Sequence, residues 1–278
     1  MQTDQIDGLT RLFVIIGDPI HGVRTPTVFN EMFGRKGINA VMVAHHLAAA
    51  DIETGWAGLK TIRNLDGIVI TMPHKTPMSG LVDSLGINGR VAGAINAARR
   101  NSDGTWEGDM FDGVGCVDGL KRQGHELAGR SVFLMGIGGA GSAIAGALAQ
   151  AGVKRLVVQD IDAPRLERVV ERIRSAYPEL SVGPGTIGDG PFDVVVNATP
   201  QGMREGDPLP FDPSPLPAST LVVDVIIKPE VTPLLTLAQK TGHPTQLGRH
   251  MHRGQAIAVA KFFGFDLESC AGQSGARP

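Results

Sequence analysis

Three glycines in the middle of the chain have the spacing of a phosphate-binding loop. Gly136, Gly138 and Gly141 follow the apolar run 132–135 in the pattern G-x-G-x-x-G, and a stretch of small residues comes next. In such a loop the first glycine permits a tight turn, the second lets the backbone approach a pyrophosphate, and the third lets helix and strand pack closely. The N-terminus of the following helix adds free N–H groups and a partial positive charge. The pattern therefore predicts a dinucleotide site.

An acidic residue follows where such a site binds ribose. The apolar run 156–158 leads into Asp160, which lies 24 positions after Gly136. A carboxylate there accepts hydrogen bonds from the ribose 2′-hydroxyl and repels a 2′-phosphate. No arginine follows until Arg165. We therefore expect NAD to be preferred, with NADP possible; a strand–turn–helix that binds no nucleotide is the simpler alternative.

Composition and charge restrict the class of protein. The 278 residues are enough for about two domains, and 42% of them are hydrophobic. A formal net charge of −2 gives no reason to expect nucleic acid or an anionic membrane as a partner. The two cysteines, Cys116 and Cys270, are too few for a disulfide framework or a cysteine metal cluster. Because the sequence also lacks a signal-peptide pattern and a membrane-length apolar run, we expect a cytoplasmic protein.

Short apolar runs alternate with helical patterns in the first third of the chain. In order, we predict a strand at 12–16, a helix from Thr25 that ends before Gly37, a strand at 40–47, a helix at about 50–64 and a strand at 67–73. This alternation is typical of a parallel sheet, which binds ligands beyond the carboxyl ends of its strands. Residues 18–25 and 71–75 are therefore expected at one rim.

The first predicted helix has recognisable start and core signals. Thr25 is predicted as its N-cap because Pro26 follows, and proline suits the first helical turn. Val28, Phe29 and Met32 are expected to point inward.

The pattern changes near residue 110, where we place a domain boundary. The first domain, 1–109, is expected to be an α/β domain that ends with a short strand at 93–97 and a hairpin at 104–109. The second, 110–249, is expected to be a doubly wound Rossmann domain. Its predicted strands are 132–135, 156–158, 193–197 and 221–227, with Asp162 as the N-cap of an intervening helix. A last helix, about 250–268, is expected to pack back on the first domain, and the tail 269–278 to be disordered.

Seven short motifs, taken together, resemble the shikimate/quinate dehydrogenase family. They match it in order and spacing over about residues 11–265, and they are 17–20 with 25–26, 70–75, 93–96, 108–113, 136–141, 197–203 and 248–255. The resemblance implies an N-terminal substrate-binding domain with a mainly parallel sheet, followed by an NAD(P)-binding Rossmann domain. It also implies an oxidoreductase acting on CH–OH, which transfers a hydride reversibly between a nicotinamide cofactor and a ring hydroxyl, as between shikimate and 3-dehydroshikimate.

The resemblance also implies roles for individual residues. Lys75 matches the family's catalytic lysine and Asp112 its paired aspartate, and such a pair handles the proton of the reacting hydroxyl. Thr71, Asn96 and Gln255 match positions that hydrogen-bond the ring hydroxyls. The expected cofactor contacts are Gly136, Gly138, Gly139, Ala140, Gly141, Asp160, Asn197, Thr199 and Gly248.

The positions that bind the substrate carboxylate in the family differ in this chain. Where the family has two side-chain hydroxyls in the first loop, the sequence has Val23 and Thr25, with Arg24 between them. The other departures are Met110 and Phe111 in place of Asn-Thr, and Ile227 in place of a tyrosine. Losing two hydrogen bonds to a charged group reduces affinity for shikimate by roughly a hundredfold unless Arg24 replaces them.

Two interpretations of the substrate follow from these departures. In one, the protein is an ordinary shikimate dehydrogenase that binds the carboxylate with Thr25 and Arg24. In the other, its substrate is a shikimate- or quinate-like cyclic polyol, and activity on shikimate is weak or absent. A non-catalytic sensor of a quinate-type ligand is disfavoured because Lys75 and Asp112 are both present. An amino acid or methylene-tetrahydrofolate dehydrogenase is disfavoured by the set of residues that matches hydroxyl-binding positions.

The remaining expectations concern metals and partners. Three histidines near the end, His243, His250 and His252, lack the spacing of metal ligands, so we interpret them as solvated or as helix-start residues and expect no metal. The partner is expected to be a small cyclic polyol or hydroxy acid, without nucleic acid or membrane, and the protein to be a monomer or homodimer.

Overall fold

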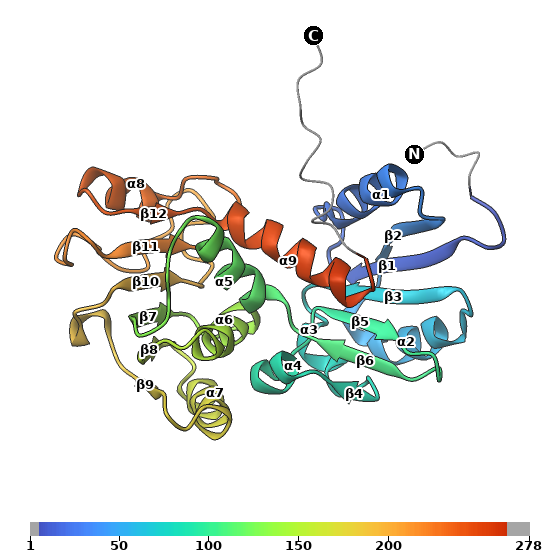
Figure 1. The fold of residues 1–278 in the computed structure, drawn as a ribbon, viewed down its shortest axis with the longest axis horizontal. Helices are drawn as coiled ribbons and strands as arrows, with labels where there is room; N and C mark the ends of the chain where they lie inside the picture. The colour runs from blue at the N-terminus through green and yellow to red at the C-terminus, as the bar shows by residue number, and fades with distance from the viewer. Residues whose placement is uncertain (1–5, 266–278) are drawn as a thin grey trace, which may run out of the picture. The chain divides into compact units, whose positions relative to one another are not determined.

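The computed structural model describes residues 6–265, which form two compact α/β units with six strands in each sheet (Figure 1). The first unit contains the described residues up to Phe111 and those from Ala256 onward, and the second contains Asp112–Gln255. Two mainly parallel sheets confirm the predicted α/β class. Cys270, the predicted tail 269–278 and the end of the predicted last helix lie outside the described residues.

The sheet of the first unit is mixed, because three of its neighbouring pairs are parallel and the two pairs made by β5 are antiparallel. Its strands are β1 Arg11–Gly17, β2 Ala40–His46, β3 Leu65–Ile70, β4 Ser84–Leu85, β5 Ala97–Arg100 and β6 Trp106–Asp109, in the order β2-β1-β3-β5-β6-β4. β1 pairs in parallel with both β2 and β3, while β5 runs antiparallel to β3 and β6. The three predicted strands of the first third of the chain are thus neighbours in one sheet.

Five helical segments accompany this sheet, together with the last part of a sixth. They are α1 Thr25–Lys36, the 3-10 turn η2 Ala49–Asp51, α2 Ile52–Thr61, α3 Lys75–Met78, α4 Ile87–Ala92 and, from Ala256, the end of α9 Gly248–Phe262. The prediction that Thr25 is the N-cap was wrong. Thr25 is already helical, the N-cap is Arg24, and no side chain caps the helix. Val28 was also placed wrongly: it is 40% exposed, and the inward face is Phe29, Met32 and Phe33.

The predicted strand at 93–97 starts later than expected. Gly93 has a φ of 65° and forms the left-handed C-cap of the short helix α4. Its N–H donates to the carbonyl of Gly89 at 2.8 Å, a common way for a helix to end. The chain therefore enters β5 only at Ala97.

The strand β1 is buried on both faces, as expected for a strand between parallel neighbours. Phe13 and Ile15 belong to one apolar cluster, and Val14 and Ile16 belong to another. The first cluster also contains Phe263 and Phe265, whose rings lie 5.2 and 5.4 Å from that of Phe13. Residues at the end of the described chain therefore complete the core of the first unit.

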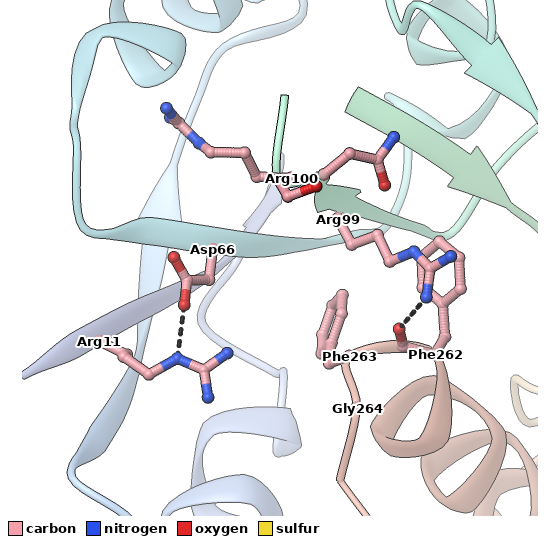
Figure 2. A pocket seen from close by; sticks show the side chains of 9 residues that line it. Arg11, Asp66, Arg99, Arg100, Phe262, Phe263 and Gly264 are labelled. Atoms are coloured by element: carbon pink, nitrogen blue, oxygen red, sulfur yellow. Dashed lines mark hydrogen bonds and ion pairs between the residues drawn. The ribbon is translucent and has the colours of Figure 1, made fainter. Parts of the chain in front are cut away.

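Arginines surround an open pocket at the amino end of this sheet (Figure 2). Arg99 donates to the carbonyl oxygen of Phe262 at 3.0 Å, and Arg11 pairs with Asp66 at 2.5 Å. Arg99 also pairs with Glu107 at 2.7 Å. These contacts tie the end of α9 to β5 and to its neighbouring strand β6.

The second unit has a fully parallel sheet with the strand order of a Rossmann fold. Its strands are β7 Ser131–Met135, β8 Arg155–Gln159, β9 Ser181–Pro184, β10 Val194–Asn197, β11 Leu221–Asp224 and β12 Thr245–Gln246, in the order β12-β11-β10-β7-β8-β9. The first strand of this unit, β7, lies in the centre of the sheet. The strands that follow it, β8 and β9, lie on one side of β7, and β10, β11 and β12 lie on the other side, so the direction in which strands are added switches between β7 and β10. Ligands bind at the carboxyl side of such a switch point.

The helices of the second unit are α5 Asp112–Arg122, α6 Gly139–Gln150, α7 Ala163–Ala176, the 3-10 turn η3 Ile187–Asp189, α8 Pro233–Lys240 and the first half of α9. Asp162 caps α7 as predicted, since its side chain accepts from the N–H of Arg165. The predicted strand 221–227 was too long: β11 ends at Asp224, which leaves Ile227 48% exposed beyond it. No helix within residues 6–265 is long and apolar enough to cross a membrane.

Candidate active site

Backbone hydrogen bonds bring Thr71, Lys75 and Asn96 together at the carboxyl end of β3. The N–H of Thr71 continues the ladder to β1 by donating to the carbonyl of Ile16 at 2.9 Å. The carbonyl of Lys75, the first residue of α3, accepts from the N–H of Ile95 at 2.9 Å. The carbonyl of Asn96 accepts from Ile70 at 2.8 Å. The predicted lysine and two of the predicted hydroxyl-binding residues therefore share one rim.

A buried histidine supports the turn that carries Lys75. His74 is 1% exposed, and its Nε2 lies 2.7 Å from the carbonyl oxygen of Leu47, just after β2. The N–H of Asp18 donates to the carbonyl of Met72 at 2.9 Å, so the turn is also held to the end of β1. The expected juxtaposition of the loops after β1 and β3 is thus confirmed.

Asn96 is fully buried and connects this rim to the segment before Asp112. Its Oδ1 accepts from the N–H of Phe111 at 2.9 Å. A side chain that ties down a buried N–H has a structural role independent of any substrate.

The positions expected to bind a carboxylate lie in apolar surroundings. Val23 packs against the same cluster that contains Phe111, and the ring of Phe111 lies 5.0 Å from that of Phe262. Met110 is completely buried. Thr25 is half-buried and Arg24 is exposed.

Asp112 begins α5 in the second unit and is held by α9. It is 3% exposed, and its Oδ1 accepts from Nε2 of Gln255 at 2.8 Å. The two helices approach closely at Gly115, where a Cβ would lie only 2.5 Å from the N of Gln255 and 2.6 Å from the carbonyl oxygen of Met251. A glycine at this position is therefore required to bring Gln255 to Asp112.

The glycine loop has the geometry that its spacing predicts. Gly136 has a φ of 95°, and a Cβ there would lie 2.8 Å from the carbonyl carbon of Ala198. A Cβ on Gly141 would lie 2.0 Å from the carbonyl oxygen of Gly136. Gly138 is the N-cap of α6 and faces open space. Gly139 and Ala140 form the first turn, whose N–H groups have no helical partner.

A pocket of about 300 Å³ opens beside this loop within the second unit. Its lining consists of Met135, Gly136, Gly138, Gln159, Asp160, Ile161, Arg165, Ala198, Thr199, Pro200 and Gln201. It lies at the carboxyl ends of β7, β8 and β10, where the fold predicts a dinucleotide.

Asp160 lines the pocket, but its carboxylate is already engaged by the protein. Oδ2 accepts from the N–H of Ile137 at 2.6 Å, and Oδ1 accepts from the N–H of Asp162 at 2.8 Å and from Arg165 at 3.0 Å. The side chain is only 7% exposed. Burial opposes ionisation, but these hydrogen bonds prevail and lower the pKa of Asp160. The sequence predicted that Asp160 accepts hydrogen bonds from ribose, and in the structure three groups of the protein already donate to its carboxylate.

Asn197 and Gly248 do not line the pocket and instead fix the backbone near it. Asn197 is fully buried; its Oδ1 accepts from the N–H and the hydroxyl of Thr199, and its Nδ2 donates to Asp224 at 3.2 Å. Only Thr199 of these residues lines the pocket. A Cβ on Gly248 would lie 2.3 Å from the carbonyl oxygen of Ile226, so this glycine permits close packing at the start of α9.

Sequence reasoning named Arg165 and His252 without giving them a role in the site, and it gave none to Ile161. Ile161 and Arg165 line the pocket, and the signal that could have found them is their position one and five residues after Asp160. His252 is half-buried on α9; burial lowers its pKa, against the opposing effect of the Asp112 carboxylate. The interpretation of the late histidines as solvated was wrong for His243, which is 5% exposed just after α8, where its backbone N–H donates to the carbonyl of Ala238 at 2.9 Å.

Comparisons with known proteins agree with this geometry. Residues 15–98 match the shikimate dehydrogenase substrate binding domain. The chain is 34% identical over 94% of its length to the shikimate dehydrogenase (NADP(+)) of Rubrobacter xylanophilus, and covers 93% of that protein. The protein belongs to the shikimate dehydrogenase family. It is thus an oxidoreductase of that family, as its motifs predicted.

Two solved structures extend the comparison. Shikimate 5-dehydrogenase from Listeria monocytogenes, in complex with shikimate and NAD, is 30% identical and has a TM-score of 0.86, with 93% of each chain covered. The 5-ketofructose reductase of Gluconobacter sp. strain CHM43 is 25% identical and has a TM-score of 0.84, with 94% of this chain and 95% of that chain covered. The family fold therefore occurs in proteins named for different substrates.

Proposed function

We propose that the protein catalyses reversible NAD(P)-dependent hydride transfer between a ring hydroxyl of shikimate, quinate or a related cyclic polyol and its keto form. The rim that gathers Thr71, Lys75 and Asn96 is the observation that carries this proposal. The hydroxyl of Thr71 suits the recognition of substrate hydroxyls, the lysine suits proton transfer, and the buried Asn96 supports the rim.

Lys75 and Asp112 together handle the proton in this proposal. As the alcohol becomes a ketone, the amine of Lys75 takes up the hydroxyl proton, and a nicotinamide cofactor, when bound, would supply the hydride acceptor. A carboxylate in the role proposed for Asp112 stabilises the ammonium that forms when the lysine takes up that proton. The hydrogen bond from Gln255 fixes Asp112 for that role.

The preference for NAD rests on the charges around Arg165. Its guanidinium lies 3.0 Å from the carboxylate of Asp160 and 3.5 Å from that of Asp162. Two carboxylates beside one guanidinium leave a net negative charge, which disfavours a 2′-phosphate dianion. We therefore expect NAD to be used in preference to NADP.

Steady-state kinetics with both cofactors test this preference. We expect a higher kcat/KM with NAD for the wild-type protein. In Asp160→Asn, one negative charge is removed from beside Arg165, so the ratio of NADP to NAD efficiency should rise by about tenfold, which corresponds to about 1.4 kcal/mol. Glu167→Gln removes a negative charge from α7, the helix that carries Arg165, and is the control for a general effect of charge. A wild type with higher efficiency for NADP contradicts the proposed preference.

A second candidate substrate is an uncharged polyol without a carboxylate. Val23 and Phe111 form apolar surroundings where the family resemblance implies carboxylate binding. The similarity to a 5-ketofructose reductase supports this alternative, because 5-ketofructose has no carboxylate. Arg24, together with the hydroxyl of Thr25, favours an acid instead.

A screen of ring alcohols distinguishes these candidates. Cofactor reduction is measured with shikimate, quinate and uncharged cyclitols, for the wild type and for Arg24→Gln. Shikimate turnover at ordinary efficiency, lost in Arg24→Gln, supports the acid substrate. Turnover of cyclitols alone, unchanged in Arg24→Gln, supports the uncharged polyol. Ligand binding without turnover of any ring alcohol contradicts the catalytic proposal and supports a sensor.

A further inference from the structure

One buried acceptor in the lining of the pocket beside the glycine loop has no partner. The side-chain oxygen of Gln201, Oε1, is buried and accepts no hydrogen bond from the described part of the chain. A buried polar atom without a partner costs free energy, and such atoms are rare in folded proteins. An unpaired acceptor in a pocket lining is therefore suited to bind a donor group of the molecule that occupies the pocket.

The backbone that carries this side chain is fixed. The N–H of Gln201 donates to Oγ1 of Thr199 at 3.2 Å, and its carbonyl oxygen accepts from Nδ2 of Asn197 at 3.2 Å. The carbonyl of Pro200 accepts from the N–H of Met203 at 3.1 Å, which closes a turn with Gln201 in its second position. The glutamine is thus presented to the pocket from a turn with defined hydrogen bonds.

The other polar side chains of the lining are already satisfied or cannot accept. Asp160 accepts three hydrogen bonds from the protein, and the hydroxyl of Thr199 both donates and accepts. Nε of Arg165 is also buried without a partner, but a guanidinium has only donors. The other amide of the lining, Gln159, has no buried side-chain atom that lacks a partner. Gln201 Oε1 is therefore the buried acceptor of this lining that is available to a ligand.

We propose that Gln201 is a specificity-determining residue for the cofactor and that its Oε1 accepts a hydrogen bond from the amino group of adenine. The fold binds a pyrophosphate at the glycine loop and a ribose near Asp160, so the wall formed by residues 198–201 is left for the base attached to that ribose. The exocyclic amino group of adenine is a donor, which matches an unpaired acceptor. This inference rests on the proposed function, because it concerns the same cofactor.

The proposal implies discrimination against hypoxanthine, which has a carbonyl oxygen where adenine has the amino group. With hypoxanthine bound, two acceptors would meet and Oε1 of Gln201 would stay unpaired. A site built to hydrogen-bond a ligand N–H rejects an analogue that lacks it, because a buried polar group is then left without a partner. A glutamine can partly offset this by turning its amide so that Nε2 donates, whereas a carboxylate has no donor to offer.

The test measures the Kd of NAD and of nicotinamide hypoxanthine dinucleotide by isothermal titration calorimetry, without any ring alcohol. We expect wild type to bind NAD about tenfold more tightly. In Gln201→Met, which keeps the length of the side chain but removes the amide, the two Kd values should become equal within about twofold. In Gln201→Glu, which keeps an acceptor and has no donor, the ratio should be at least that of wild type.

The ratio of the two Kd values separates recognition of the base from a structural role. Gln150→Met, at an exposed position of α6, is the matched control and should keep the wild-type ratio. A purely structural glutamine would weaken both dinucleotides alike, so an unchanged ratio in Gln201→Met overturns the inference, as does a wild-type ratio near one. In those cases NAD still binds and the proposed function stands. If wild type binds neither dinucleotide, the proposed function is rejected together with this inference.

Discussion

At the scale of single residues, the proposed chemistry depends on a lysine whose main chain is fixed by its neighbours. The carbonyl of Lys75 accepts from Ile95, and the preceding His74 is buried against the end of β2. The side chain at this position is therefore presented from a well-supported turn. Its substitution should affect chemistry more than folding.

We predict that Lys75→Met lowers kcat/KM by about 10²–10⁴-fold, the usual contribution of a positioned acid or base. The affinity for the nicotinamide cofactor should hardly change, because the glycine loop belongs to the other unit. Cofactor affinity is measured by fluorescence titration and activity by cofactor reduction. Lys60→Met on α2 is the matched control, and equal activity of the two variants contradicts the assignment of Lys75.

A second residue-scale prediction concerns Asp224, which ends β11, is fully buried and accepts a hydrogen bond from Asn197. Burial raises the pKa of Asp224 above its ordinary value of 3.8, although hydrogen bonds from Ile226, Thr232 and Asn197 oppose this. Between these two pKa values the folded state binds more protons than the unfolded state, so the contribution of Asp224 to stability falls as pH rises.

We therefore expect Asp224→Asn to gain stability relative to wild type as pH is raised from 3.8. The measurement is the free energy of unfolding by urea at several pH values, and only the slope of the difference is used. The amide of Asn also replaces a carboxylate acceptor, and this adds a change in the free energy of unfolding that does not vary with pH. A difference that is constant, or that falls with rising pH, would contradict the raised pKa.

At the scale of elements, β2 is an edge strand whose outer side is covered by one side chain. Asn30 on α1 donates from Nδ2 to the carbonyl of Met42 and accepts with Oδ1 from the N–H of Met42, each at 2.8 Å. The amide thus imitates a neighbouring strand at the middle of the edge. Exposed edges favour pairing with another chain, and natural proteins commonly block them.

Asn30→Ala should remove both bonds and leave the edge at Met42 open. We expect a loss of about 1–3 kcal/mol in the free energy of unfolding and a greater tendency to self-associate. Urea denaturation and size-exclusion chromatography at several concentrations measure the two effects. Thr27→Ala, at an exposed position of the same helix, should show neither. If Asn30→Ala is as stable as Thr27→Ala, the two hydrogen bonds of Asn30 do not stabilise the fold.

Strands buried on both faces were the most predictable elements, because they appear as continuous apolar runs such as that of β1. Helix α4 was not anticipated, since six residues carry too little periodicity and its stop signal, Gly93, also suits a turn. β4 and β12 were not predictable either. Each has only two residues and is a strand only because it pairs with β6 or β11, respectively.

In the candidate site, motif residues were predictable and their partners were not. The glycine loop and Lys75 belong to local patterns that the sequence displays. The hydrogen bonds that Ile137 and Arg165 donate to Asp160, and the one that Gln255 donates to Asp112, depend on contacts between separate elements. No local sequence pattern shows which backbone N–H or side chain will donate to a given carboxylate.

At the scale of the whole molecule, the first unit is discontinuous in sequence. Val259, Ala260, Phe263 and Phe265 belong to the same core cluster as Phe13 and Phe29, yet the second unit lies between them in the chain. Removing several large apolar side chains from one core costs more than the usual stability of a domain, because each contributes about 2–5 kcal/mol.

We predict that a fragment of residues 1–111 does not fold alone. Its amide NMR spectrum should have little dispersion, and a peptide of residues 254–265 added in trans should restore dispersion by supplying the missing rings. The same peptide with Phe263→Ser is the control. A well-dispersed spectrum of the fragment without the peptide would contradict this prediction.

The discontinuity of this core also has a consequence for synthesis on the ribosome. The chain emerges from its N-terminus, so residues 1–111 leave the exit tunnel long before Phe263 and Phe265 are translated. During that interval β1 and α1 expose the apolar surface that those rings later cover. The second unit, in contrast, has its residues up to Gln255 before the first unit is complete. The second unit should therefore fold before the first, which is the reverse of the order of translation. Chaperones that bind nascent chains should bind the first unit during that interval.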